Sequence, residues 1–273
     1  MGEKNEQFIF DELMPFLKSN YKTNGFNTLI GHSRYGFFTT YLMTKRPNEI
    51  NAVISLSPYF DRKNLNLVDS VKNNLINKKL PQQLYYRFCV GNDHPEDFKA
   101  MQNMLQSENN NKNFNKKFNI KGSNFPQAKH TATPGIMVGQ ALYEIFEFWS
   151  EQQNKYGNKQ KKTLESFESL NLNVKQHYGT SLSFGMGVMN SEGWYFFGEK
   201  KYEKAIEIWK LTLEMYPNFS EIHLQIAKTQ KMLKIPLSKS LKDFEVNLSK
   251  STFYTTVEKQ ELLLELEEFK KSK

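Results

Sequence analysis

The first 150 residues alternate short apolar runs with stretches in which apolar side chains recur every three or four positions. Four runs have the length of β-strands: 26–30, 50–56, 84–90 and a weaker one at 117–121. Helical spacing separates them, and the apolar segment 136–149 is predicted to be a long helix. Strands that alternate with helices favour a parallel sheet. The pattern therefore predicts the α/β class for this part of the chain.

Beyond residue 185 the apolar spacing is helical only. The spacing of a tetratricopeptide repeat, a helix–turn–helix unit of about 34 residues, is found at Gly193, Phe196, Ala205, Trp209 and Pro217. Further helices are predicted at about 220–233 and 258–271. So few repeats do not bury a core by themselves. We expect this stack to pack on the first domain, on the terminal helix or on a protein partner.

The whole chain of 273 residues suits one large domain or two smaller ones. We predict an α/β domain over 1–152, a linker over 153–185 and a tetratricopeptide-like helical region over 186–273. The linker begins with a run of lysine, glutamine and asparagine.

The apolar run 26–30 leads directly into Gly31-His32-Ser33, and a helical pattern follows at once. This is the context of a nucleophile elbow, in which a tight turn holds a serine hydroxyl clear of the sheet. The helix N-terminus offers backbone N–H groups, such as that of Arg34, to a developing oxyanion. Tyr35 stands where a second glycine is usual, and Gly36 follows one place later.

Two further candidates follow later strands. Asp93 comes after the run 84–90, and His130 comes after the weaker strand and before the long helix. Active sites of parallel sheets lie beyond the carboxyl ends of the strands. The chain order Ser33, Asp93, His130 is that of a Ser-His-Asp triad in α/β-hydrolases. Such a histidine takes the serine proton, and the carboxylate orients the imidazole.

Alternatives to the acid and the base remain open. His94 lies next to Asp93 and competes as a base, although its place in the chain is less suitable. Glu96 or Asp97 could replace Asp93 as the acid, or simply begin a helix with favourable charge.

The substrate-binding candidates surround the serine. Tyr35 and Arg34 flank it and are candidates to contact an aromatic or acidic substrate, or to pack on the sheet. His32 is interpreted as a packing residue or as part of the substrate site.

Composition and charge distribution argue against several other classes of protein. The net charge of +8 comes from scattered lysines, without the concentrated basic face of a nucleic-acid-binding protein. The single cysteine, Cys89, excludes a disulfide framework and a cysteine-based metal site. No apolar run has the length of a membrane span, and residues 1–20 do not form a signal peptide. A Ser-His-Asp mechanism needs no metal and no organic cofactor.

Four segments resemble the putative esterase family, an α/β-hydrolase group that includes enterochelin-type siderophore esterases and S-formylglutathione hydrolases. They are FIFDELMPFLKSNY at 8–21, GHSRYG at 31–36, Ser57-Pro58, and HTATP at 130–134. The resemblance covers roughly residues 5–150, and one bacterial branch also carries a tetratricopeptide-like extension. It implies Ser33 as nucleophile, His130 as base and a small-molecule, siderophore or carbohydrate ester as substrate. It marks the acid less clearly.

The same resemblance implies that the early strands of the sheet are absent from this chain. We therefore expect an unpaired sheet edge and a fragment of a longer esterase, with only Arg34 assignable to the oxyanion hole. As it stands the chain is expected in the cytoplasm, although a longer product could carry a secretion signal before Met1.

Two functions compete at this stage. The first is a serine carboxylic-ester hydrolase that works through an acyl-enzyme. The second is a catalytically silent hydrolase that binds a protein through its helical region. The unpaired sheet edge and the incomplete repeat stack both favour a homodimer.

Overall fold

The computed structural model describes residues 2–62, 64–76, 79–108, 111, 114–157, 164–182 and 185–271. The chain divides into two compact units. Unit 1 comprises 1–161 and 167–182, and unit 2 comprises 162–166 and 183–273.

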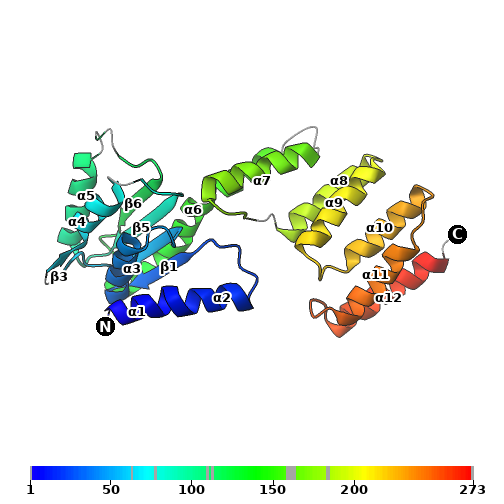
Figure 1. Cartoon of the computed structure of the whole chain (residues 1–273), viewed down its shortest axis with the longest axis horizontal. Helices are drawn as coiled ribbons and strands as arrows, with labels where there is room; N and C mark the ends of the chain where they lie inside the picture. The colour runs from blue at the N-terminus through cyan, green and yellow to red at the C-terminus, as the bar shows by residue number, and fades with distance from the viewer. Residues whose placement is uncertain are drawn as a thin grey trace. The chain divides into compact units, whose positions relative to one another are not determined.

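Unit 1 is built on a four-stranded parallel sheet in the order β1-β2-β5-β6. Figure 1 labels β1, β5 and β6 of this sheet. The strands are β1 (Thr28–His32), β2 (Ala52–Leu56), β5 (Leu84–Val90) and β6 (Phe118–Asn124). The predicted α/β class is thereby confirmed. β1 lies at one edge of this sheet, pairing with β2.

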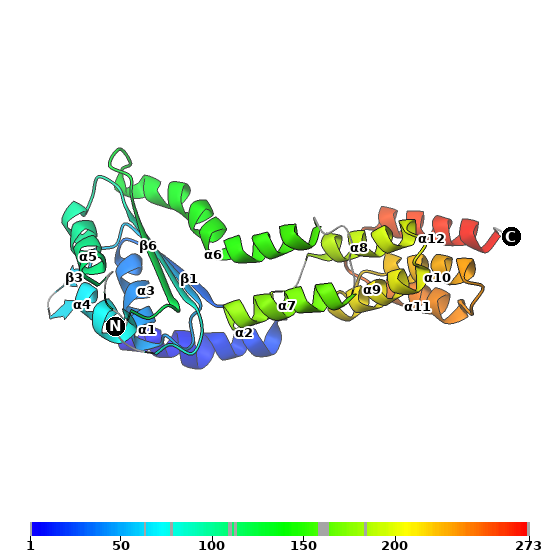
Figure 2. The same cartoon turned by 90° about the horizontal axis from the view of Figure 1, so that it is seen from above.

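Strands β2 and β5 are buried along their whole length. Helices cover both faces of the sheet, and a parallel strand covered on both sides is a continuous apolar run rather than an alternating one. Figure 2 shows α3 (Arg34–Lys45), α4 (Leu67–Val71) and α5 (Pro95–Glu108) on one face and α6 (Thr133–Gly157) on the other. This explains why the run 84–90 coincides with β5 at both ends.

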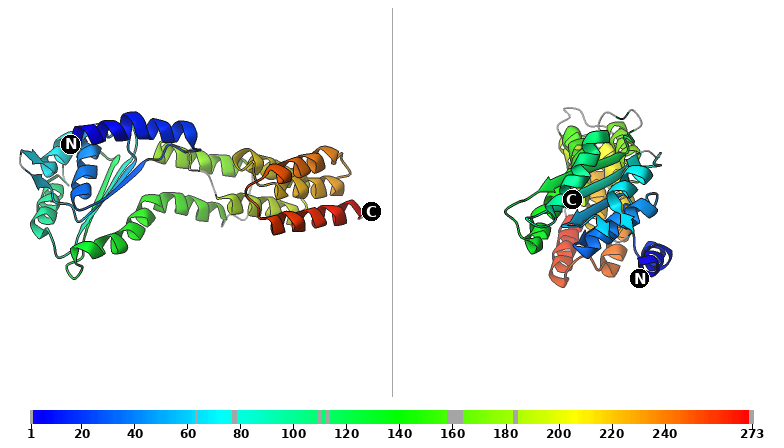
Figure 3. Two further views of the ribbon diagram at one scale, coloured as in Figure 1. Left: turned by 90° about the horizontal axis from the view of Figure 1, so that it is seen from below. Right: turned by 90° about the vertical axis from the view of Figure 1, so that its left-hand side faces the viewer.

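Most helices of unit 1 lie where the sequence pattern predicts helical spacing. Helix α6 extends beyond the predicted range 136–149 at both ends. Figure 3 shows that the first three segments form one continuous helix. In chain order the helices are α1 (Gly2–Gln7), η1 (Phe8–Leu13), α2 (Met14–Asn20), α3 (Arg34–Lys45), α4 (Leu67–Val71), η2 (Lys72–Ile76), α5 (Pro95–Glu108), η3 (His130–Ala132), α6 (Thr133–Gly157) and α7 (Leu164–Tyr178). A two-stranded antiparallel ribbon joins β3 (Asp61–Arg62) and β4 (Leu65–Asn66).

The range 153–185 contains the end of α6 and the whole of α7. Tyr178, the last residue of α7, is fully buried in unit 1. Its hydroxyl donates to the carbonyl oxygen of Ile145 at 2.9 Å, and its ring centroid lies 5.6 Å from that of Phe26. Tyr178 therefore attaches the C-terminal part of this range to the α/β unit.

A buried ion pair ties β5 to α6. The guanidinium of Arg87 donates to Glu144 Oε2 at 2.8 Å, with only 4% and 11% of the two side chains exposed. Lys121 donates to the other oxygen of Glu144 at 2.7 Å. Burial opposes ionisation of Glu144, but hydrogen bonds from Lys121 and Gln140 and the charge of Arg87 outweigh it. The pKa of Glu144 therefore lies below its ordinary value.

Glu144→Gln is expected to lower the free energy of unfolding by about 3 kcal/mol, because it leaves the buried charge of Arg87 without a counter-ion. A lowered carboxyl pKa gives stability that is present at neutral pH and is lost as the pH falls through the folded-state pKa. The difference from wild type should therefore shrink in acid. Urea denaturation at neutral and acidic pH measures both effects. Glu151→Gln, which changes an exposed residue of α6 whose ion pair with Lys155 lies in solvent, is the control, and an equal loss there would contradict this assignment.

Unit 2 is helical throughout the part that the structure describes. Its main helices are α8 (Met186–Gly198), α9 (Tyr202–Met215), α10 (Glu221–Met232), α11 (Ser238–Lys250) and α12 (Thr256–Lys271). Trp209 of α9 is fully buried, and a Cβ atom at Gly193 of α8 would lie 2.0 Å from its indole nitrogen. Only glycine permits this close approach of the two helices. The tetratricopeptide-like assignment itself stays a prediction.

The core of unit 2 also uses the terminal helix. Leu266 of α12 is buried together with Leu224 of α10 and with Phe244 and Leu248 of α11. The terminal helix α12 therefore packs against helices α10 and α11. Across the described residues of both units, the structure has no helix with the length and apolar character required to cross a membrane.

Candidate active site

Ser33 occupies the turn between β1 and α3 in a strained conformation. Its backbone angles are φ 59° and ψ −119°, a region that residues with a side chain rarely adopt. Its N–H donates to the carbonyl oxygen of Leu56 at 2.8 Å, which fixes the turn to the end of β2. A Cβ atom at Gly31 would lie 2.2 Å from the carbonyl oxygen of Tyr35, so the turn requires glycine there. This is the geometry of a nucleophile elbow.

Tyr35 does not disturb this turn. Its side chain is 66% exposed, so it extends into solvent from the first turn of α3. The close approach of the helix to β2 occurs instead at Gly36, where a Cβ atom would lie 3.2 Å from both Leu56 O and Pro58 Cβ. The displaced glycine therefore performs the packing role at its own position.

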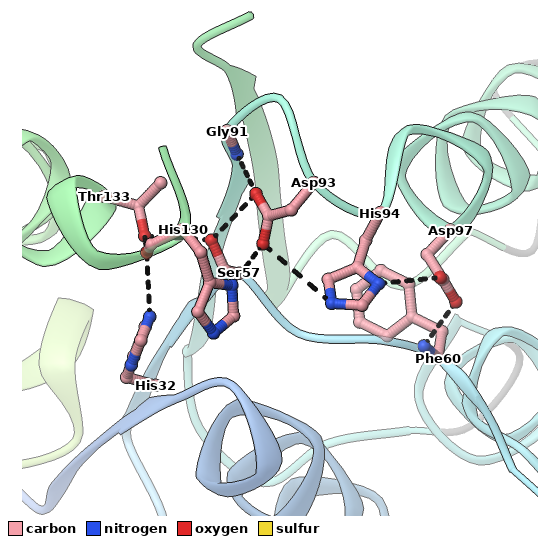
Figure 4. Close-up of polar contacts among 9 residues, drawn as sticks. All are labelled: His32, Ser57, Phe60, Gly91, Asp93, His94, Asp97, His130 and Thr133. Carbon is pink, nitrogen blue, oxygen red and sulfur yellow. Dashed lines mark hydrogen bonds and ion pairs between the residues drawn. The ribbon is translucent and has the colours of Figure 1, made fainter. Parts of the chain in front are cut away.

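His130 and Asp93 form a hydrogen-bonded pair beyond the carboxyl ends of β5 and β6. Nδ1 of His130 donates to Oδ2 of Asp93, and Figure 4 shows the two side chains facing each other. Asp93 lies in the loop between β5 and α5, and His130 begins η3 just before α6. The structure thus brings together the histidine and the carboxylate that the sequence separates by 37 positions.

The carboxylate of Asp93 is held by several donors. Its Oδ1 accepts from the backbone N–H of Gly91 at 2.8 Å and from Ser57 Oγ at 3.3 Å. Burial disfavours the charged form. Hydrogen bonds from His130, from the N–H groups of Gly91 and Asp93 and from Ser57 outweigh this effect and hold the pKa of Asp93 below its ordinary value. Asp93 is therefore ionised at neutral pH.

The hydroxyl groups of Ser57 and Thr133 lie next to the pair. Their hydroxyl groups lie 2.9 Å apart, and Thr133 Oγ1 also donates to the carbonyl oxygen of His130 at 3.0 Å. Both side chains are buried, and Ser57 has a positive φ of 46°. Neither hydroxyl could be assigned a role from the sequence, although Ser57 lies in the Ser57-Pro58 segment and Thr133 in the HTATP segment that carry the family resemblance.

His32 contacts the backbone of His130. Its Nε2 lies 2.9 Å from the carbonyl oxygen of His130, and the two ring centroids are 4.5 Å apart. Because a carbonyl only accepts, Nε2 of His32 carries the proton in this contact. The residue preceding Ser33 thus links the nucleophile turn to the histidine loop. Its predicted substrate contact stays a prediction, as do those of the exposed residues Arg34 and Tyr35.

The alternative acids and base lie differently from Asp93 and His130. Asp97 Oδ1 accepts from the backbone N–H of Phe60 at 2.6 Å, and Glu96 is exposed in the first turn of α5. His94 Nε2 lies 3.9 Å from Asp93 Oδ2. Of these three carboxylates, Asp93 is the one hydrogen-bonded to His130.

Ser33 and His130 share no hydrogen bond among the residues that the structure describes. Catalytic hydrogen bonds are often long in the free enzyme and tighten when substrate binds. The two residues are nevertheless linked locally, because His32 precedes the serine and contacts the His130 carbonyl. Arg34 begins α3, so helix hydrogen bonding does not use its N–H.

One group of side chains has the composition of a metal site. Asp93, His94 and His130 each offer one ligand atom, and these atoms lie within 4.8 Å of one another. The group overlaps the His130–Asp93 pair.

Comparison with known proteins gives the family. Two solved structures are similar in fold: an uncharacterised protein from Capnocytophaga ochracea DSM 7271 and an IroE-like serine hydrolase from Shewanella oneidensis. The first is 14% identical with a TM-score of 0.54 and aligns over 96% of this chain and 74% of its own. The second is 14% identical with a TM-score of 0.55 and aligns over 77% of this chain and 66% of its own. No curated protein matches the sequence.

The model of the putative esterase family matches residues 2–161, more than half of the 273 residues. The two structural similarities, at low identity, support the fold alone. The family match covers every residue of the elbow and of the histidine–carboxylate pair. This chain therefore belongs to the putative esterase family of hydrolases.

Proposed function

We propose that the protein is a serine carboxylic-ester hydrolase in which Ser33 is the nucleophile, His130 the general base and Asp93 the acid of the triad. The observation that carries the proposal is the His130–Asp93 hydrogen bond. The contact of His32 with the His130 carbonyl links it to a serine in a strained strand-to-helix turn. Backbone strain of this kind is retained where function requires it.

The reaction follows from this arrangement. Ser33 Oγ attacks the ester carbonyl carbon and gives its proton to Nε2 of His130, while Asp93 stabilises the imidazolium through Nδ1. The backbone N–H of Arg34 donates to the oxyanion. The imidazolium then protonates the leaving alcohol, and an acyl-enzyme remains on Ser33. Water, deprotonated by His130, attacks the acyl carbon, and the carboxylic acid departs as Ser33 regains its proton.

The substrate we propose is a small-molecule ester, in keeping with the family. Arg34 and Tyr35 project from the first turn of α3 and are exposed, so their side chains are available to the group that a bound ester presents. The siderophore and carbohydrate esters implied by the resemblance are two classes to compare in a substrate panel.

A fluorophosphonate probe tests the nucleophile directly. Ser33 Oγ would displace fluoride and form a stable phosphonyl ester, and peptide mass spectrometry would place the added mass on the peptide that contains Ser33. Ser33→Ala should take up no label, whereas Ser70→Ala, which removes an exposed serine hydroxyl, should be labelled like wild type. A folded wild-type chain that takes up no label would contradict the proposal and favour the silent, protein-binding alternative.

A further inference from the structure

A second imidazole faces the carboxylate of the pair. His94 begins the turn into α5 with a positive φ of 49°, and its Nε2 lies 3.9 Å from Asp93 Oδ2. Its ring centroid is 6.0 Å from that of His130. Figure 4 shows His94 and His130 on either side of Asp93. The catalytic proposal uses only one of these two histidines.

The three ligand atoms suit zinc in type, and they all lie within 4.8 Å of one another. Zn²⁺ binds histidine nitrogen and carboxylate oxygen in tetrahedral geometry, which places neighbouring ligand atoms about 3.3 Å apart. Nε2 of His94 lies 3.9 Å from Asp93 Oδ2, so these two atoms need to approach each other by about 0.6 Å. The hydrogen-bonded atoms of His130 and Asp93 need to move apart by about 1 Å to admit the ion. The two histidine side chains are 35% and 36% exposed, so an ion can enter from solvent.

A carboxylate also lies near the second ring nitrogen of His94. Its other ring nitrogen, Nδ1, lies 3.8 Å from Asp97 Oδ2. Metal-binding histidines commonly direct the nitrogen that does not bind the metal toward a carboxylate, which fixes the tautomer and raises the basicity of the ligand nitrogen. A proton on Nδ1 leaves the lone pair of Nε2 directed at Asp93. Asp97 is itself held by the backbone N–H of Phe60.

We propose that Asp93, His94 and His130 form an inhibitory Zn²⁺ site, with water as the fourth ligand. Zinc binds through Asp93 Oδ2, Nε2 of His94 and Nδ1 of His130. The proton that Nδ1 of His130 shares with Asp93 moves through solvent to Nε2 of the same ring, so no net proton is lost. Nε2 then carries a proton and cannot accept the one from Ser33. Metal binding is independent of the proposed esterase activity, whereas the inhibition rests on it.

Direct metal binding is measured first, on the untagged full chain. Cobalt(II) is titrated as a probe, because four-coordinate cobalt absorbs strongly in the visible range, and Zn²⁺ affinity is obtained by competition with a chromophoric chelator. We expect His94→Asn to weaken zinc binding at least 10-fold and to abolish the four-coordinate cobalt spectrum. Asp97→Asn should weaken binding by about 10-fold through its effect on His94. His223→Gln, which removes a histidine of unit 2, should bind like wild type.

Inhibition by Zn²⁺ is measured next, as a fraction of the uninhibited rate of each variant. We expect the zinc concentration for half-inhibition to rise in His94→Asn by the same factor as the dissociation constant. Wild-type zinc binding that His94→Asn leaves unchanged would overturn the site, as would the absence of metal binding by wild type. Zinc binding that depends on His94 but does not inhibit would support the site and overturn the inhibitory role. A chain without esterase activity would still give the binding result.

Discussion

Ser33→Ala is expected to abolish ester hydrolysis, with a fall in kcat of about 10⁶-fold. The serine oxygen forms the acyl-enzyme, and neither neighbour of Ser33 can take its place. Nε2 of His32 is bound to the His130 carbonyl, and the protonated guanidinium of Arg34 has no lone pair for attack. KM should change little, since the hydroxyl acts in the chemical step. Hydrolysis of p-nitrophenyl acetate by wild type and variant measures the difference.

The same variant separates loss of chemistry from loss of folding. Alanine at position 33 adopts the positive φ at a similar strain to serine, and the N–H that donates to Leu56 is retained. Circular dichroism and thermal unfolding should therefore match wild type. Residual activity of Ser33→Ala within 10-fold of wild type, in a folded protein, would show that another group performs the hydrolysis.

The positions of the strands were predictable because both faces of the central strands are buried. An apolar run then stands out against polar loops, as β5 shows over its whole length. β1 was predicted at 26–30 but extends over Thr28–His32. The difference arises because Gly31 and His32 pair with Ser55 and Leu56 of β2, a long-range pairing that local hydrophobicity does not reveal.

Ser33 was nominated from the Gly-x-Ser turn between an apolar run and a helix, and Asp93 and His130 from the carboxyl-end rule for parallel sheets, which needs only the strand positions. The hydroxyls of Ser57 and Thr133 could not be nominated in this way. Their contact joins residues 76 positions apart, and serine and threonine are common in loops. Their role depends on the backbone of Ser57, whose positive φ accompanies a fully buried side chain.

The effect of Tyr35 on the packing of the turn also could not be predicted from the sequence. The sequence places a tyrosine where a second glycine is usual, and it does not show which residue of the helix meets the sheet. In the fold, the helix and β2 approach each other most closely at Gly36, and the tyrosine ring lies in solvent. Which of two adjacent residues faces the sheet depends on the rotation of α3, and a change of one position along a helix turns the side chain by about 100°.

Asp93→Asn is expected to lower kcat by about 10⁴-fold while the protein remains folded. The backbone N–H of Gly91 donates to Oδ1, so the amide oxygen of asparagine takes that place and the NH₂ group faces His130. An NH₂ donor there forces Nδ1 of His130 to accept. The ring proton then resides on Nε2, where it blocks transfer from Ser33.

The pH profile and a matched variant distinguish this explanation from a general loss of charge. The pKa of Asp93 lies below its ordinary value. The wild-type carboxylate is therefore ionised at every pH above this lowered pKa. The loss of kcat in Asp93→Asn relative to wild type should therefore persist across neutral pH. It should decrease only in acid, where the Asp93 carboxylate of the wild type becomes protonated. Glu96→Gln, which changes an exposed carboxylate three residues away, should retain nearly full activity. An equal loss in both variants would show that Asp93 has no special relation to His130, and it would remove the basis for assigning the triad.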